Sequence, residues 1–144
     1  VILMSNFGVA GNLRVDGRLI DPRRPERETR EKGSVIIVIG TDLPLSERQL
    51  KRVARRSVVG LSRTGSFLGN GSGDIAIAFS NGNLIPHYSR QKIISVRTLH
   101  DNAIDTVFEA TAEAVEEAVI SSLYHGKTMK GIRNKVVHSL NEFI

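Results

Sequence analysis

The chain has 144 residues, 40% of them hydrophobic, with 20 Lys and Arg against 15 Asp and Glu and a formal net charge of +5. This length and apolar content predict one domain with a single core. The absence of cysteine excludes disulfides, thiolate nucleophiles and cysteine-based zinc sites, and we expect a cytoplasmic protein. No apolar run approaches the length of a membrane span, so no membrane partner is expected.

The amino-terminal part is predicted to form strands and then a charged loop. Strands are expected over residues 1–8 and 11–20, and Asp16-Gly17 predicts a hairpin turn inside the second. Residues 21–33 contain two prolines, dense mixed charge and no apolar residue. That composition predicts a solvated loop and a suitable place for a chain break.

Two strands and two helices are predicted after the loop. Five consecutive apolar residues follow Ser34, and a similar run covers residues 75–79, so both strands are expected to be buried on both faces. A helix should begin near Ser46, which has capping-box spacing to Gln49. A second helix is expected over residues 102–124. The elements predict the α/β class, as part of a four-layer α/β/β/α sandwich.

Ser34 lies where self-cleaving hydrolases have their nucleophile, directly after Gly33 and at the start of a buried strand. Cleavage of the Gly33–Ser34 bond would free the α-amine of Ser34, which can act as the base for its own hydroxyl. Glycine suits the carbonyl side of the bond because it tolerates a strained backbone. A Gly-Ser pair before a strand more often only ends a loop, so the motif alone leaves both interpretations open.

A second hydroxyl cluster precedes the strand at residues 75–80. If the chain is already extended at Ser72, the two-residue period puts Ser72 and Asp74 on the same side. The alternative is a Gly-rich turn with a Ser or Asp cap. The spacing of the glycines matches neither a P-loop nor a dinucleotide fingerprint.

The first predicted helix carries five cations on one face, and this pattern suggests binding to another macromolecule rather than hydrolysis. A basic stripe over Arg48–Arg56 is typical of proteins that bind a phosphate backbone, and the alternative is an assembly module in which these cations pair with a neighbouring subunit. However, no aromatic residue interleaves with these cations, and no DNA- or RNA-binding signature is present, so nucleic acid is not an expected partner. The cations are Arg48, Lys51, Arg52, Arg55 and Arg56. The four histidines lack metal-pair spacing, so no metal is expected, although a Ser-His-Asp triad stays open.

Several stretches in one order resemble the DmpA-type aminopeptidases, a family of L-aminopeptidase/D-Ala-esterase/amidases and β-peptidyl aminopeptidases. They are residues 33–45, 49–56, 60–65, 70–75 and 78–80, and residues 1–8 resemble the end of the family's α-subunit. The resemblance implies that residues 1–33 are an α-subunit tail with its linker and residues 34–144 a catalytic β-subunit, together part of one domain. It also implies the layered fold shared with ornithine acetyltransferases.

The resemblance assigns roles to the residues singled out above. Ser34 would be the nucleophile and its α-amine the general base, with Ser72 and Asp74 orienting and polarising that amine. Asn6 falls where the family has an asparagine that helps to stabilise the oxyanion. Family relatives that transfer acetyl groups use threonine as nucleophile, so Ser34 favours hydrolysis. The implied substrates are short peptides, amides or esters with a free amino end, and no cofactor is implied.

The resemblance also implies partners for the chain. The family precursor is much longer than this sequence, which opens on Val1 inside a predicted strand, so we expect a fragment or one piece of a split protein. The missing α-subunit portion would supply further strands and much of the substrate pocket, and activity is not expected of this chain alone. A homo-oligomer of processed heterodimers is the expected assembly.

Overall fold

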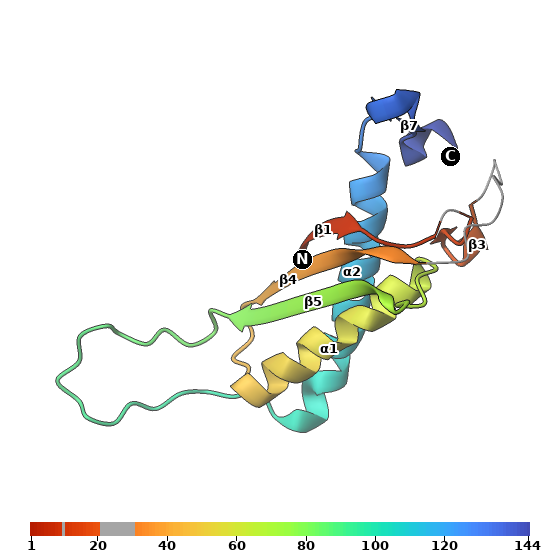
Figure 1. Cartoon of the computed structure of the whole chain (residues 1–144). Helices are drawn as coiled ribbons and strands as arrows, with labels where there is room; N and C mark the ends of the chain where they lie inside the picture. Colours follow the sequence, from red (N-terminus) through yellow and green to blue (C-terminus); the bar gives the residue numbers. More distant parts are fainter. Residues whose placement is uncertain (10, 21–30) are drawn as a thin grey trace.

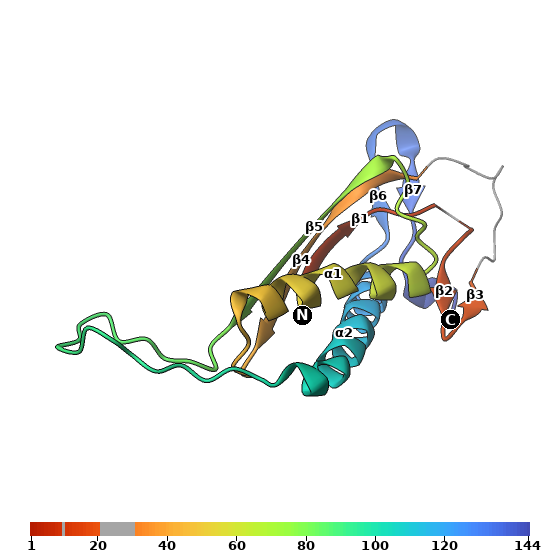
Figure 2. The ribbon, with the colours of Figure 1, turned by 90° about the horizontal axis from the view of Figure 1, so that it is seen from below.

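A three-stranded sheet and two helices form the body of the computed structural model, which describes residues 1–9, 11–20 and 31–144. The sheet has the order β1–β4–β5, with β1 antiparallel and β5 parallel to the central β4. Both helices lie on the same side of this sheet (Figures 1 and 2). The elements are β1 (Ile2–Asn6), β4 (Lys32–Thr41), α1 (Glu47–Arg63), β5 (Gly71–Ser80) and α2 (Ile104–Tyr124).

Shorter elements complete the chain. The predicted turn at Asp16-Gly17 is confirmed, since it joins β2 (Arg14–Val15) to β3 (Arg18–Leu19) in an antiparallel hairpin. Beyond α2, β6 (Met129–Lys130) pairs with β7 (Val136–Val137). Three single turns of 3-10 helix are η1 (Asp101–Ala103), η2 (Ile132–Asn134) and η3 (Leu140–Glu142). Residues 21–30 of the predicted charged loop lie outside the described residues.

Both predicted helices are confirmed, including the start of α1. The Ser46 side chain accepts a hydrogen bond from the Gln49 backbone N–H, and the Gln49 side chain accepts one from the Ser46 backbone N–H. This reciprocal capping box satisfies two backbone donors at the helix start. None of the helices in the described residues is long and apolar enough to cross a bilayer.

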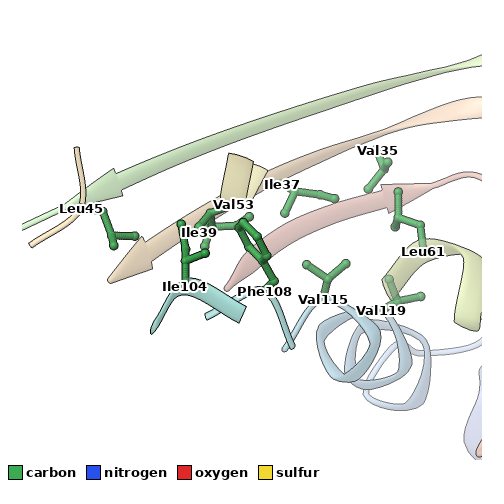
Figure 3. Close-up of a cluster of buried hydrophobic side chains, with 10 residues drawn as sticks. All are labelled: Val35, Ile37, Ile39, Leu45, Val53, Leu61, Ile104, Phe108, Val115 and Val119. Atoms are coloured by element: carbon green, nitrogen blue, oxygen red, sulfur yellow. The ribbon is translucent and has the colours of Figure 1, made fainter. Parts of the chain in front are cut away.

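The core lies between the sheet and the helices (Figure 3). Alternate residues of β4 point toward the helices, and the relative exposures of Val35, Ile37 and Ile39 are 0%, 1% and 5%. They pack with side chains of both helices and of the segment before α1: Leu45, Val53, Leu61, Ile104, Phe108, Val115 and Val119. Each fully buried side chain of this kind contributes about 1.5–3 kcal/mol.

The other side of the sheet, here called the open face, carries exposed apolar side chains. Ile36, Ile75 and Ile77 are 39%, 55% and 55% exposed, and Ile2, Met4 and Phe79 are also exposed. The prediction that these strands are buried on both faces is therefore wrong for the described chain. An apolar run shows that both faces of a strand are apolar, and here α1 and α2 cover one of them.

Candidate active site

The candidate residues meet at the amino ends of β4 and β5. In the strand register Ser34 lies opposite Asn6 of β1 on one side and Gly73 of β5 on the other. Ser72 pairs with Gly33, one position earlier. Sequence-distant residues therefore surround the Gly33–Ser34 peptide bond from both neighbouring strands. Ser34 is the third residue of β4, so the strand begins two residues earlier than predicted.

The Ser34 hydroxyl lies against the carbonyl that precedes it. Its Oγ donates a hydrogen bond of 2.7 Å to the Gly33 carbonyl oxygen. Gly33 has a φ of +108°, in the region that favours glycine. A Cβ at this position would lie 1.8 Å from the carbonyl oxygen of Asn6, so the close approach of β1 also requires glycine.

Ser72 and Asp74 share one side of β5, as predicted from the alternation of strand residues. The Ser72 hydroxyl donates to Asp74 Oδ1 over 3.4 Å. A Cβ added to Gly73 would lie 3.4 Å from Ser34 Oγ. The Ser34 side chain is therefore on the side of the sheet to which a side chain at position 73 would point. Ser72 and Asp74 consequently point to the opposite side and flank the backbone of Ser34 rather than its hydroxyl.

Asn6 is exposed at the end of β1 and lies directly opposite Ser34. Beside it is a cavity of about 360 Å³, lined by the end of β1, the residues after it, the turn after α1, and α2. Most of the cavity lining is apolar or glycine, and the polar side chains in it are Ser5, Asn6, Asn12, Thr64 and Ser66. The cavity is large enough for a small organic group. Its lining includes neither Gly33 nor Ser34, and Val119 and Leu123 of α2 put it on the helix side of the sheet.

Sequence reasoning missed Glu31, a buried carboxylate just before β4. Its relative exposure is 3%. It accepts hydrogen bonds from the Ser66 hydroxyl and from the backbone N–H groups of Phe67 and Gly69. In the sequence Glu31 belongs to a run of charges that predicts solvent exposure, and nothing local distinguishes it from its neighbours.

Three cations of the basic stripe on α1 contact residues of α2 or η1. Arg48 and Arg52 lie 2.5 and 3.5 Å from Asp101 Oδ2. Arg52 and Arg56 also stack over the Phe108 ring, at 5.0 and 4.3 Å from its centroid. Hydrogen bonds from Arg48 and then Gln49 hold the pKa of Asp101 below its ordinary value. These contacts lie where α1 meets α2 and η1, and they involve Arg48, Arg52 and Arg56 of the five cations.

A metal centre is not evident in the part of the chain that the structure describes. No group of three or more His, Asp or Glu side chains there is arranged to hold an ion.

Comparison with known proteins identifies the family. The model of peptidase family S58 matches residues 1–137. The chain belongs to peptidase family S58. It is 33% identical to the β-peptidyl aminopeptidase BapA of Sphingosinicella microcystinivorans, over 97% of this chain and 40% of that protein. The DmpA-type family predicted from the sequence is thereby confirmed.

Solved structures confirm the fold class. The PH0078 protein from Pyrococcus horikoshii OT3 matches with a TM-score of 0.83 and 47% identity, over 96% of this chain and 38% of that one. The L-aminopeptidase D-Ala-esterase/amidase from Ochrobactrum anthropi matches with a TM-score of 0.68 and 41% identity, over 74% and 30%. The latter is a prototype of the serine aminopeptidases with a variant of the Ntn-hydrolase fold.

The S58 chain is thus α/β and forms two adjoining layers, one sheet and one pair of helices, of the predicted sandwich. It spans 30–40% of the length of these relatives.

Proposed function

We propose that the complete protein is a self-processing serine aminopeptidase or amidase with Ser34 as nucleophile. The observation that carries this proposal is the 2.7 Å hydrogen bond from the Ser34 hydroxyl to the Gly33 carbonyl oxygen. The Gly33 position itself has room only for glycine. A hydroxyl held beside the carbonyl of its own preceding peptide bond supports intramolecular attack on that bond, because proximity favours such a reaction.

Self-cleavage would proceed in two steps. Ser34 Oγ attacks the carbonyl carbon of Gly33, a C–O bond forms, and the C–N bond breaks as the hydroxyl proton passes to the Ser34 nitrogen. Water then hydrolyses the resulting ester and leaves a carboxylate on Gly33. The product is a chain that begins at Ser34, with a free α-amine and a free hydroxyl. Residues 1–33 and 34–144 would then belong to the two separate subunits.

In turnover the free amine of Ser34 would take the proton of the Ser34 hydroxyl as it attacks the substrate. Ser72 and Asp74 would orient this amine, which is supported by their register on either side of the Ser34 backbone nitrogen. The Asn6 amide would stabilise the oxyanion, since Asn6 lies opposite Ser34. In known enzymes the loss of one such donor lowers the rate by about 10²–10³-fold.

The proposed substrates are short peptides, amides or esters with a free amino end. Similarity to a β-peptidyl aminopeptidase and to an L-aminopeptidase D-Ala-esterase/amidase supports this class. The remaining α-subunit portion would be a partner that covers the open face, whose exposed isoleucines and Phe79 need an apolar neighbour. We further propose a homo-oligomer of processed heterodimers and a cytoplasmic location.

The test is hydrolysis of an aminoacyl p-nitroanilide by the complete protein and two variants. Ser34→Ala should abolish both cleavage of the Gly33–Ser34 bond and hydrolysis, because the attacking oxygen is lost. Ser34→Thr should retain some cleavage at a lower rate, because the hydroxyl remains but β-branching restricts its rotamer. A Ser34→Ala protein that still hydrolyses the substrate would exclude Ser34 as the nucleophile.

A further inference from the structure

Glu31 joins two segments that lead into the candidate active site. On one side of it the chain enters β4 and reaches Gly33 and Ser34. On the other side its carboxylate binds residues 66–69, here called the clamp loop, which lies between α1 and β5 and runs on toward Ser72. A single side chain therefore connects the amino ends of both parallel strands.

The contacts of Glu31 are those of a buried structural carboxylate. Phe67 N and Gly69 N donate to Oε2 at 3.2 and 3.1 Å, and the Ser66 hydroxyl donates to Oε1. Within the described part of the chain no cation pairs with this carboxylate. Removing the carboxylate would leave these donors unsatisfied in a site that solvent barely reaches, so the attachment of the two segments depends on it.

The backbone around Glu31 is equally confined. A Cβ on Gly71 would lie 2.7 Å from the Glu31 carbonyl oxygen, and a Cβ on Gly33 would lie 1.8 Å from the Asn6 carbonyl oxygen. The short segment from Glu31 to Gly33 is thus held between β1 and the residues that begin β5. Such enclosure can hold Gly33 at its φ of +108° while a free chain would relax.

We propose that Glu31 is a positioning residue for self-cleavage. By binding the clamp loop it holds the segment before the scissile bond so that the Gly33 carbonyl stays against the Ser34 hydroxyl. Glu31 exchanges no proton and touches no reacting atom, so the bond changes are those given above for self-cleavage. This inference rests on the proposed function and adds to it a residue that acts before the enzyme is mature.

The experiment follows cleavage of the complete protein over time after cell-free synthesis, with the fragments identified by intact mass. Glu31→Ala should slow cleavage by on the order of 10²-fold, the effect expected when a reacting group is displaced by about 1 Å. Glu31→Gln should restore much of the rate, because its amide oxygen can still accept from the backbone N–H groups. Glu31→Asp should stay slow, because the shorter side chain does not reach the clamp loop.

Gln49→Ala is the matched control for a loss of buried hydrogen bonds. Gln49 is 2% exposed, and its side chain donates to the Leu99 carbonyl and to Asp101 at the far end of α1. Urea unfolding of each uncleaved variant, made with Ser34→Ala, gives the stability lost in each case. Gln49→Ala should lose comparable stability and cleave at the wild-type rate.

The outcomes separate the inference from the function on which it rests. Slow cleavage in Glu31→Ala and Glu31→Asp, with recovery in Glu31→Gln and normal cleavage in Gln49→Ala, supports the inference. Cleavage that tracks stability alone across all variants overturns it, as does wild-type cleavage in Glu31→Ala. An uncut wild-type protein contradicts the proposed function itself and overturns this inference with it.

Discussion

The two faces of the central sheet differ in how completely this chain covers them. On the helix face, Val35 and Ile37 of β4 are at most 1% exposed because both helices pack over them. On the open face, Ile75 and Ile77 of β5 are each 55% exposed, although they are as apolar as their counterparts. The side chains of the helix face are buried within this chain. The open face is equally apolar, but its side chains stay exposed in the described residues.

The candidate active-site residues are divided between these two faces of the sheet. The Ser34 hydroxyl lies on the open face, while Ser72 and Asp74 lie on the other side of the sheet. The backbone nitrogen of Ser34 lies between the two sets, so an amine released there could be reached from the side of Ser72 and Asp74. We infer that the helix side organises the base and that substrate approaches from the open side.

The largest expected effect is at Gly33. Gly33→Ala should abolish self-cleavage of the complete protein, because the added Cβ would collide with the Asn6 carbonyl oxygen at 1.8 Å. Gly73→Ala is the matched control on the open face, since its Cβ would lie an ordinary 3.4 Å from Ser34 Oγ. Timed intact-mass measurements compare the two. Equal cleavage in both variants would show that the Gly33 backbone does not limit processing.

The next effect concerns the base. Asp74→Ala should lower kcat of the processed enzyme by on the order of 10²-fold with little change in KM, because it removes an interaction that acts mainly in the transition state. Asp74→Glu should be tolerated better, since it keeps the carboxylate. If Asp74 only caps a turn, Asp74→Ala would cost about 1 kcal/mol of stability and leave kcat per folded molecule unchanged. Melts and rates on the same samples decide between the two roles.

A pair of core substitutions tests the two faces directly. Ile37→Ala should destabilise both the 144-residue chain and the complete protein by about 2–5 kcal/mol, because Ile37 is fully buried in this chain. Ile77→Ala should lower the free energy of unfolding of the chain alone by only about 0.5 kcal/mol. In the complete protein the same substitution should lower it by about 2 kcal/mol or more. Urea unfolding measures each value. A small effect of Ile77→Ala in the complete protein would mean that nothing covers the open face.

The smallest effect is expected at Asp101, on the helix side and away from the Gly33–Ser34 bond. The Arg48 and Gln49 hydrogen bonds lower the pKa of Asp101 in the folded state. Its contribution to stability is therefore present above the ordinary pKa of about 3.9 and lost as the pH falls through the lower, folded-state pKa. Asp101→Asn should lower the urea midpoint slightly at pH 7. At a pH below the folded-state pKa of Asp101 it should leave the midpoint unchanged, and cleavage should be unchanged at either pH. A pH-independent difference would contradict this assignment.

The local signals of the sequence predicted most of the fold and part of the site. The capping box at Ser46 and Gln49 and the Asp16-Gly17 turn depend on neighbours within a few residues, so they are visible in the sequence. The shared side of Ser72 and Asp74 follows from strand alternation alone. The opposite orientation of Ser34 depends on the register between β4 and β5, which no local pattern specifies.

Burial that depends on distant partners was not predictable. Glu31 is buried because Ser66, Phe67 and Gly69 supply donors from another part of the chain. Within its own charged run, it has the composition of a solvated loop. The same limit applies to the open face, since an apolar strand gives no information about which element covers it.

Intact-mass analysis of the purified complete protein, with amino-terminal sequencing of its fragments, tests the central claim most directly. The claim is that Ser34 becomes an amino-terminal nucleophile on the open face. The predicted result is two fragments, of which the downstream one begins at Ser34, and a single uncut species in Ser34→Ala. An active wild-type enzyme that remains one uncut chain would contradict the claim, because its Ser34 would have no free amine.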